Sequence, residues 1–409
     1  MAGHEQIDTL IIGGGQAGLT MSHMLSRRGR AHLVLERHRI AERWRSERWD
    51  GLHFQFPNWS IQLPDFPFPH HDADGFASKN DIVAYIEAYA AFIKPPLRTG
   101  ITATRLRQRA DSGGFIAETS KGAIESNNVV VATGPYQQAQ IPDLLRDNDD
   151  LFQIHASRYQ NPRQLPAGAV LVVGAGASGA QIAEELMRAG RRVYLAIGSH
   201  RRVPRRYRGR DLTWWMRALR QDNVIPLARD PNRFVPLAIT GAYGGHTVDF
   251  RDYAAGGVTL LGRLAGARDG TLYFADDLAK SLADGDAGYR AFMDTIDAYV
   301  ERRRLEFPPD PEAHQMRPDP QGLLTPPRQL DIRSDNISSI IWATGYGVDF
   351  GWIDIPVLGP NGEPLHQQGV TAVPGLYFLG LFWLSGVYSS FLSGVADDAA
   401  RLADHLVER

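Results

Sequence analysis

The strongest constraint on the fold is a glycine-rich unit that the chain contains twice. The first copy reads IIGGGQAGLTMSHMLSRRGRAHLVLER over residues 11–37, and the second reads VVGAGASGAQIAEELMRAGRRVYLAIGSHRR over residues 172–202. An ungapped alignment pairs the glycines of the two copies: Gly13 with Gly174, Gly15 with Gly176, Gly18 with Gly179, and Gly29 with Gly190. In each copy an apolar strand pattern leads through GxGxxG into a helical pattern and a second strand, which predicts a βαβ unit that binds a dinucleotide.

The three glycines of each turn have separate physical tasks. The first (Gly13, Gly174) permits the tight bend, the second (Gly15, Gly176) lets the backbone approach a pyrophosphate, and the third (Gly18, Gly179) lets helix and strand pack closely. The phosphates then meet free N–H groups and the positive end of the helix dipole. A bare glycine turn is the alternative for one isolated copy, and repetition of the whole unit argues against it.

The two units differ in charge at their far ends. Glu36 follows the third glycine at about the spacing, roughly 20 residues, expected of an acid that accepts a ribose hydroxyl pair. Its partner in the alignment is Ile197, and a basic stretch follows. That stretch holds Ser199, Arg201, Arg202, Arg205, Arg206, Arg208 and Arg210. Because arginine can fork around phosphate oxygens, we predict FAD in the first unit and NADPH in the second, with Ser199 and Arg201 as the preferred phosphate contacts. A solvated basic loop is the alternative.

The order of the patterns indicates one domain inserted into another. Two similar apolar strands end in glycine, NVVVATG at 128–134 and SIIWATG at 339–345, while proline-rich segments at 160–168 and 307–328 resemble linkers. Helices are expected over 276–300 and 394–408. The predicted fold is α/β, with two dinucleotide-binding Rossmann-like domains. Residues 1–159 and 326–409 would form the FAD-binding domain, and residues 160–325 the inserted NADPH-binding domain.

Composition excludes several classes of protein. The 409 residues contain no cysteine, so disulfide chemistry and thiolate metal sites are excluded, and we expect no metal centre. The net charge is −2, from 44 basic and 46 acidic residues, which does not favour nucleic acid. No apolar run approaches the roughly 18 residues of a membrane helix, and the N-terminus lacks a signal-peptide pattern. We expect a soluble cytoplasmic protein without a membrane partner. The sequence leaves the oligomeric state open, with a homodimer as one alternative.

Several motifs, in order, resemble one known family. They are GGGQAG, the tract RWRSERWDGLHFQFPNWSIQLPDFPFP at 43–69, YIEAYAAF at 85–92, VVVATGPY, IHASRY, GAGASG, IIWATGY, and GLYFLGLFWLSGVYSSFLSGVADDAARLA at 375–403. Together they span nearly the whole chain and resemble the class B flavoprotein monooxygenases, which include flavin-containing monooxygenases, YUCCA-type enzymes and Baeyer–Villiger monooxygenases.

The chain departs from the family pattern in two places. The FxGxxxH fingerprint is matched at His155 and by the aromatic Tyr159, but Asp149 and Leu151 replace its phenylalanine and glycine. Tyr159-Gln160 replaces the Trp-Pro typical of Baeyer–Villiger enzymes. Many flavin-containing monooxygenases have an asparagine beside the reactive edge of the flavin. Gln55 falls at about that place, and Asn58 is the nearest asparagine, so these two are the candidate catalytic residues. An ordinary polar residue of a strand or turn is an equal alternative for Gln55.

The resemblance implies a set of cofactor contacts. Gly13, Gly15, Gly18, Glu36, Arg37, Trp44, Trp49, Thr133, Gly134, Gly380 and Leu381 would bind FAD. Gly174, Gly176, Ser178, Gly179, Ser199 and Arg201 would bind NADPH, and Thr344 and Gly345 would lie on a hinge between the cofactors. The two tryptophans fit the core equally well. The apolar segment Leu381–Ser390 is a candidate substrate lining, with packing as the alternative.

The implied function is an NADPH-dependent, FAD-containing monooxygenase. By resemblance it forms a C4a-hydroperoxyflavin and transfers one oxygen atom from O2 to a nitrogen, sulfur or carbonyl centre of a small organic substrate. The main alternative is an NAD(P)H-dependent flavoprotein reductase that passes electrons to a protein or a small acceptor. A non-catalytic flavin sensor is a third hypothesis, against which the intact second unit argues.

Overall fold

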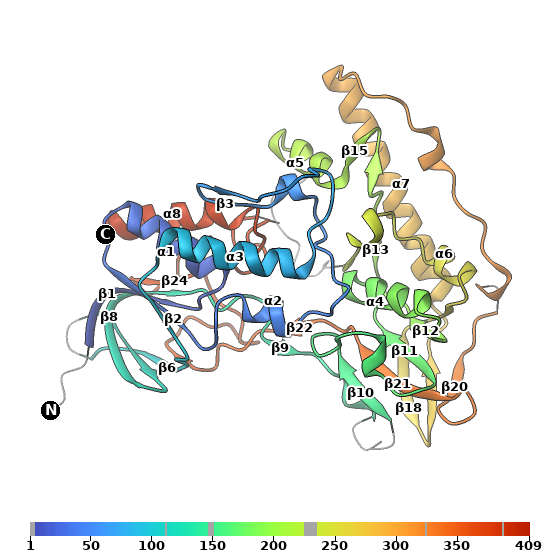
Figure 1. Ribbon diagram of the computed structural model, residues 1–409, viewed down its shortest axis with the longest axis horizontal. Coiled ribbons are helices and arrows are strands. Elements are labelled where there is room, and N and C mark those ends of the chain that lie inside the picture. Colours follow the sequence, from blue (N-terminus) through green and yellow to red (C-terminus); the bar gives the residue numbers. More distant parts are fainter. Residues whose placement is uncertain (1–4, 111–112, 146–150, 225–234, 324, 387) are drawn as a thin grey trace.

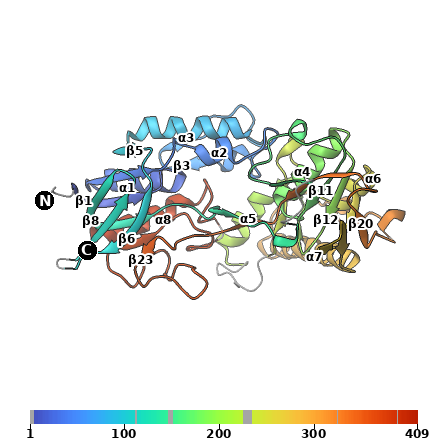
Figure 2. The same cartoon turned by 90° about the horizontal axis from the view of Figure 1, so that it is seen from below.

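The chain folds into two lobes, each built on its own sheet (Figures 1 and 2). The computed structural model describes residues 5–110, 113–145, 151–224, 235–323, 325–386 and 388–409. One lobe contains both ends of the described chain, and the other is made largely of its middle section (Figure 1). The chain therefore leaves the first lobe, builds the second and returns.

The first lobe is built on a mixed eight-stranded sheet. In spatial order its strands are β23 (Ile353–Asp354), β6 (Ala103–Gln108), β7 (Phe115–Thr119), β8 (Gly122–Val131), β1 (Glu5–Ile12), β2 (His32–Glu36) and β5 (Leu97–Thr99), and β24 (Leu376–Phe378) pairs with β8. The centre is parallel, with Ile11 of β1 opposite both Val34 and Val130. Helix α1 (Gln16–Arg27) contacts both α3 (Lys79–Ile93) and α8 (Val395–Val407) (Figure 1).

The second lobe is built on a five-stranded sheet that is parallel throughout. Its strands, in spatial order, are β10 (Phe152–His155), β21 (Ile337–Trp342), β11 (Ala169–Val173), β12 (Val193–Ala196) and β17 (Thr259–Leu261). Its helices are α4 (Ala177–Arg188), α5 (Leu212–Gln221), α6 (Phe250–Ala255) and α7 (Leu278–Arg303). The three inner strands β21, β11 and β12 are buried almost throughout, as expected of a parallel sheet.

Short elements complete the structure. They are α2 (Glu42–Ser46), β3 (Gln62–Leu63), β4 (Phe66–Pro67), β9 (Gln138–Ala139), β13 (Arg201–Arg202), β14 (Arg206–Tyr207), β15 (Arg210–Asp211), β16 (Leu237–Ala238), β18 (Leu264–Arg268), β19 (Thr271–Phe274), β20 (Gln329–Asp331) and β22 (Tyr346–Gly347). Strands β9 and β22 pair with each other, so the segments that leave and re-enter the first lobe run side by side there.

The predicted α/β class and the insertion of one dinucleotide-type unit into another are confirmed. The two strands of the NVVVATG and SIIWATG patterns lie in different sheets, β8 in the first and β21 in the second. A second domain defined by its sheet would therefore run from about 152 to 342, and we propose these limits in place of 160–325 because they include β10 and β21.

The two glycine turns have nearly the same geometry. Gly13 has φ +113° and Gly174 has φ +117°, a region that favours glycine. A Cβ on Gly18 would lie 1.8 Å from the carbonyl oxygen of Gly13, and one on Gly179 would lie 1.9 Å from that of Gly174. The third glycine of each unit is thus required where helix and turn make contact.

Two residues of the first lobe help to form the core of the second. Trp49 and Leu52 are buried among Tyr159, Ala175 and Ala180 rather than in the core beneath α1. The segment after α2 therefore joins the lobes through apolar packing. Among the described helices, none combines the length and apolar composition needed to cross a membrane.

Two helical glycines provide a matched test of this packing. Gly179→Ala in α4 should lower the free energy of unfolding by about 1–3 kcal/mol, because its methyl group meets the Gly174 carbonyl. Gly288→Ala in the exposed face of α7 meets nothing within 4 Å and should raise it by about 0.5–1 kcal/mol. Denaturant unfolding of both variants measures the difference, and equal effects would contradict the packing account.

Candidate active site

A cavity of about 590 Å³ opens beside the first glycine turn. Many residues that the sequence predicted for FAD line it, although they come from distant parts of the chain. They are Gly13, Gly15, Glu36, Arg37, Trp44, Trp49, Thr133, Gly134 and Gly380, and the candidate Gln55 lines it too. Gly18 does not line the cavity and packs beneath the turn, as its contact with Gly13 requires.

The first cradle, which we define as the turn Gly13–Gly18 together with Glu36, presents free donors and one acid. Gly15 is the N-cap of helix α1 and provides no side-chain cap, and a Cβ on Gly15 would meet nothing within 4 Å. The Glu36 carboxylate accepts hydrogen bonds from the backbone N–H groups of Gly14 (2.7 Å) and His38 (2.9 Å). These bonds fix its orientation and leave acceptor capacity on both oxygens.

Aromatic and cationic side chains surround the rest of the cavity. Trp44 is half-buried, with Phe54 at 5.8 Å between ring centroids and the Arg48 guanidinium 5.6 Å from its ring centroid. Trp49 is 3% exposed and belongs to the core of the second lobe. Trp49 therefore both lines the cavity and belongs to the core. Arg37 is exposed and has no ion-pair partner in the described part of the chain.

The two candidate catalytic residues lie in different environments. Gln55 lines the cavity, and no hydrogen bond of its side-chain amide is found among the described residues. Asn58 lies in a 3₁₀ turn outside the cavity, where its amide donates to the carbonyl of Asp72 (2.9 Å). The geometry retains Gln55 as a candidate and gives Asn58 a role in the loop.

The second cradle, which we define as the turn Gly174–Gly179 together with residues 198–202, repeats the first without its acid. Gly176, the N-cap of helix α4, has the backbone angles of Gly15 and again provides no side-chain cap, although a Cβ on Gly176 would lie 3.0 Å from Cβ of Pro236. Ser178 lines the large cavity, so the start of α4 faces the first cradle. Ser199 and Arg201 are both exposed, and Arg201 has no ion-pair partner within the described ranges. Arg201 is therefore free to receive a phosphate.

Most of the other arginines in this stretch already have partners. Arg202 pairs with Asp249 (2.7 Å) and Asp286 (2.6 Å). Arg205 pairs with Asp211 (2.6 Å), and Arg208 pairs with Asp297 (2.6 Å). Arg206 donates to the carbonyl of Gly245 (3.1 Å), and Arg210 lies over Trp214, 5.4 Å from its ring centroid. Burial and ion pairing thus reserve most of the stretch for structure, and Ser199 and Arg201 stay the predicted phosphate contacts.

Arg205 connects the second lobe to the candidate residue of the first. Its guanidinium is 2% exposed, binds both carboxylate oxygens of Asp211, and donates to the backbone carbonyl of Gln55 (2.8 Å). The same group lies 5.0 Å from the ring centroid of Phe76. The backbone at Gln55 is thus held by a buried cation from the basic stretch.

A second connection runs through His155 and the hinge residues. The backbone N–H of Ser157 donates to Nδ1 of His155 (3.1 Å), so Nε2 carries the proton and donates to the carbonyl of Gly345 (3.0 Å). Thr344 donates through its hydroxyl to the carbonyl of Gln140. Burial lowers the pKa of His155 below its ordinary value. Tyr159 donates to Glu185 (2.7 Å), whereas Asp149 lies outside the described residues.

The C-terminal apolar segment contributes mainly core. Leu381 and Leu384 are buried under the first sheet, and of the described residues in Leu381–Ser390 only Ser390 lines the cavity. The packing alternative is therefore favoured for this segment. A Cβ on Gly380, which has φ +76°, would lie 2.6 Å from Cβ of Ala17, so Gly380 permits close approach to α1.

Several lining residues were missed by sequence reasoning. Gln16 donates to the carbonyl of Ser390 (2.7 Å), which joins the start of α1 to the chain before α8. Phe56 and Phe391 line the cavity with ring centroids 5.0 Å apart. Arg43 donates to the carbonyl of Tyr136. None of these contacts has a local sequence signal, because each joins residues far apart in the chain.

Comparison with known proteins places this geometry in a family. A model described as pyridine nucleotide-disulphide oxidoreductase matches residues 10–224. An uncharacterized CzcO-like oxidoreductase from Geobacillus kaustophilus is 31% identical over 98% of both chains. The chain belongs to the pyridine nucleotide-disulphide oxidoreductase family. Since it contains no cysteine, no dithiol of its own can take part in the chemistry.

Other proteins similar to this chain include monooxygenases. The rice (Oryza sativa subsp. japonica) indole-3-pyruvate monooxygenase YUCCA1 is 32% identical over 46% of this chain and 47% of its own length. A flavin-containing monooxygenase from Stenotrophomonas maltophilia has TM-score 0.68 at 18% identity, covering 99% of both chains. The OTEMO complex with FAD and NADP has TM-score 0.58 at 16% identity, covering 99% of this chain and 86% of that one. The predicted class B flavoprotein monooxygenase family, and with it an oxidoreductase enzyme, is confirmed.

Acid should weaken the stabilising contribution of His155, whose ring donates to the carbonyl of Gly345. Because the folded-state pKa of His155 is lowered, the folded state binds fewer protons than the unfolded state. Its contribution is therefore complete above about pH 6.5, the ordinary histidine pKa, and is lost as the pH falls below that value. His155→Gln removes this titration, so stability should depend less on pH below about 6.5. Thermal unfolding from pH 8 to 5 tests this, and parallel curves for the two proteins would contradict it.

Proposed function

We propose that this protein is an NADPH-dependent, FAD-containing monooxygenase that transfers one oxygen atom from O2 to a nitrogen, sulfur or carbonyl centre of a small organic substrate. The observation that carries the proposal is the pair of uncapped, geometrically matched helix starts with opposite charge beside them, Glu36 at one and Arg201 at the other. Bound FAD would supply the chemistry, by accepting a hydride from NADPH and reducing O2.

The residues of the first cradle fit FAD. Gly15 leaves open space at the start of α1, where a pyrophosphate would meet unpaired N–H groups. The fixed Glu36 carboxylate would accept the ribose hydroxyls, and an acid at this place would repel a 2′-phosphate. Thr133, Gly134 and Gly380 line the same cavity and would lie along the flavin.

The residues of the second cradle fit NADPH. The start of α4 at Gly176 would receive its pyrophosphate, in a turn that Gly174 and Gly179 shape, and Ser199 and Arg201 would receive its 2′-phosphate. Ser178 lines the large cavity, so a dinucleotide bound at α4 would extend toward the FAD. Thr344, which donates to Gln140, and Gly345, which accepts from His155, would lie on the connection between the two sites.

The protein's own groups would orient the reactants and exclude water. Gln55 would offer its free amide to the flavin edge or the substrate, with its backbone fixed by Arg205. Phe56 and Phe391 form an apolar wall that would restrict water at the reacting centre. An uncharged or weakly polar substrate fits this lining best.

The test is whether the oxygen is transferred to the substrate or released as hydrogen peroxide. Purified flavin-loaded protein is given NADPH and a thioether, an amine or a ketone, and both oxygenated product and hydrogen peroxide are measured. Oxygenated product in proportion to the NADPH consumed supports the proposal. NADPH oxidation that yields only peroxide, whichever substrate is added, would favour the alternative of a flavoprotein reductase for another acceptor.

Arg201 should set the nucleotide preference. Arg201→Gln removes a free cation and should lower kcat/KM for NADPH by about 10- to 100-fold, the range for a hydrogen bond to a charged group, while leaving NADH almost unchanged. Arg206→Gln is the matched control, because Arg206 is also exposed but bonds to the carbonyl of Gly245. Equal loss with both nucleotides would show that Arg201 does not contact the 2′-phosphate.

A further inference from the structure

Neighbouring arginines on strand β13 point to opposite sides. Arg201 is exposed and without an ion-pair partner in the described ranges, whereas Arg202 is 8% exposed. This follows from the alternation of side chains along a strand. β13 pairs with β16, and the N–H of Arg201 donates to the carbonyl of Pro236 (2.8 Å). The position of Arg201 therefore depends on what holds Arg202 on the other side.

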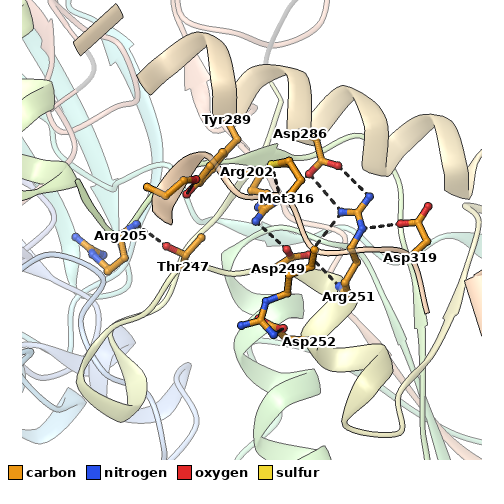
Figure 3. Close-up of polar contacts among 12 residues, drawn as sticks. Arg202, Arg205, Thr247, Asp249, Arg251, Asp252, Asp286, Tyr289, Met316 and Asp319 are labelled. Atoms are coloured by element: carbon orange, nitrogen blue, oxygen red, sulfur yellow. Dashed lines mark hydrogen bonds and ion pairs between the residues drawn. The ribbon is translucent and has the colours of Figure 1, made fainter. Parts of the chain in front are cut away.

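Arg202 is held by a buried cluster of charges (Figure 3). Its guanidinium lies 2.7 Å from Asp249 and 2.6 Å from Asp286, and 4.4 Å from the ring centroid of Tyr289. Asp249 is the N-cap of α6, and Asp286 and Tyr289 belong to α7. Arg202 thus joins the β13 backbone to two helices.

A second arginine neutralises the same acids. Arg251 lies 2.9 Å from Asp286, 3.6 Å from Asp249 and 2.6 Å from Asp319 (Figure 3). Asp319 comes from the proline-rich return segment. The cluster therefore contains two arginines and three aspartates, and loss of Arg202 would leave the three acids with Arg251 alone, on the inner side of β13.

The residue before Arg201 is also held in place. His200 is buried, with its ring 4.9 Å from that of Phe250 between centroids. A Cβ on Gly285 of α7 would lie only 2.8 Å from its Nε2, so the helix approaches the ring closely there. His200 and Arg202 point into the protein on either side of Arg201, which is left as the outward group between two fixed neighbours.

We propose that Arg202, held by Asp249 and Asp286, is a positioning residue for nucleotide selectivity: it directs Arg201 at the 2′-phosphate of NADPH and keeps the acids behind it neutralised. The inference rests on the proposed function only in taking NADPH as the nucleotide. Arg202 itself does not contact the phosphate, because its guanidinium is enclosed by the aspartates and Tyr289.

The test measures binding to the oxidised, flavin-loaded protein. Calorimetry with NADP+ and with NAD+ gives the ratio of dissociation constants for wild type, Arg202→Met and Arg202→Lys. Arg202→Met should weaken NADP+ binding about tenfold, the lower end for a hydrogen bond to a charged group, and leave NAD+ binding unchanged. Arg202→Lys keeps the charge without the planar fork and should restore part of the loss.

Two further proteins separate positioning from general damage. In an Arg201→Gln background, Arg202→Met should cause no further loss of NADP+ affinity, because the group that it positions is absent. Arg208→Met is the matched control, since it removes another ion pair of the same stretch (Arg208–Asp297, 2.6 Å) and should keep the wild-type ratio.

Three results would overturn the inference. They are an unchanged ratio in a folded Arg202→Met protein, an equal loss with both nucleotides, and an undiminished effect without Arg201. Should Arg202→Met fail to fold, the ratio of NADP+ and NAD+ dissociation constants is compared between wild type and Arg202→Lys instead. Since binding is measured without turnover, a protein that never oxygenates a substrate would contradict the proposed function while leaving this result intact.

Discussion

The close packing of a helix glycine against the carbonyl of the preceding turn, made once in each lobe, is the constraint on which the rest of the structure depends. Gly18 packs on the carbonyl of Gly13, and Gly179 on that of Gly174, so closely that a Cβ at either position would overlap the carbonyl oxygen. This contact seats each helix directly at the end of its strand. Neither helix start has a side-chain cap, so the first N–H groups remain available to a phosphate.

Selectivity between two such similar starts must come from the next strand. In the first cradle a carboxylate held by two N–H groups stands beside the glycine turn. In the second, the equivalent Ile197 is fully buried, and the charged residues come only afterwards. The backbone of the turn binds the pyrophosphate in both units. The side chains that follow the strand recognise the ribose, and these differ between the two units.

The sequence predicted what is local and repeated. Each βαβ unit depends on short-range spacing, so its strands, turn and helix followed from pattern alone, as did Glu36 beside the first turn. The stretch after β12 was harder, because seven candidate polar residues cannot be sorted by spacing. Only the partners Asp211, Asp249, Asp286 and Asp297, which lie up to tens of residues away, show that Arg202, Arg205 and Arg208 are structural. Spacing alone could not show either that the side-chain amide of Asn58 donates to the backbone carbonyl of Asp72, 14 residues away, rather than facing the cavity.

The packing of the segment after α2 explains why the two cradles behave as one site. Trp49 and Leu52 belong to the core of the second lobe, Gln55 receives a hydrogen bond from Arg205, and a Cβ on Gly241 would lie 1.9 Å from the carbonyl oxygen of Phe54. This segment is part of the first lobe in sequence and is fixed by the second lobe in space. A rotation of one lobe against the other would therefore have to break apolar burial, a charged hydrogen bond and a close backbone contact together. The cavity is lined from both lobes, and its shape is accordingly set by contacts that neither lobe makes alone.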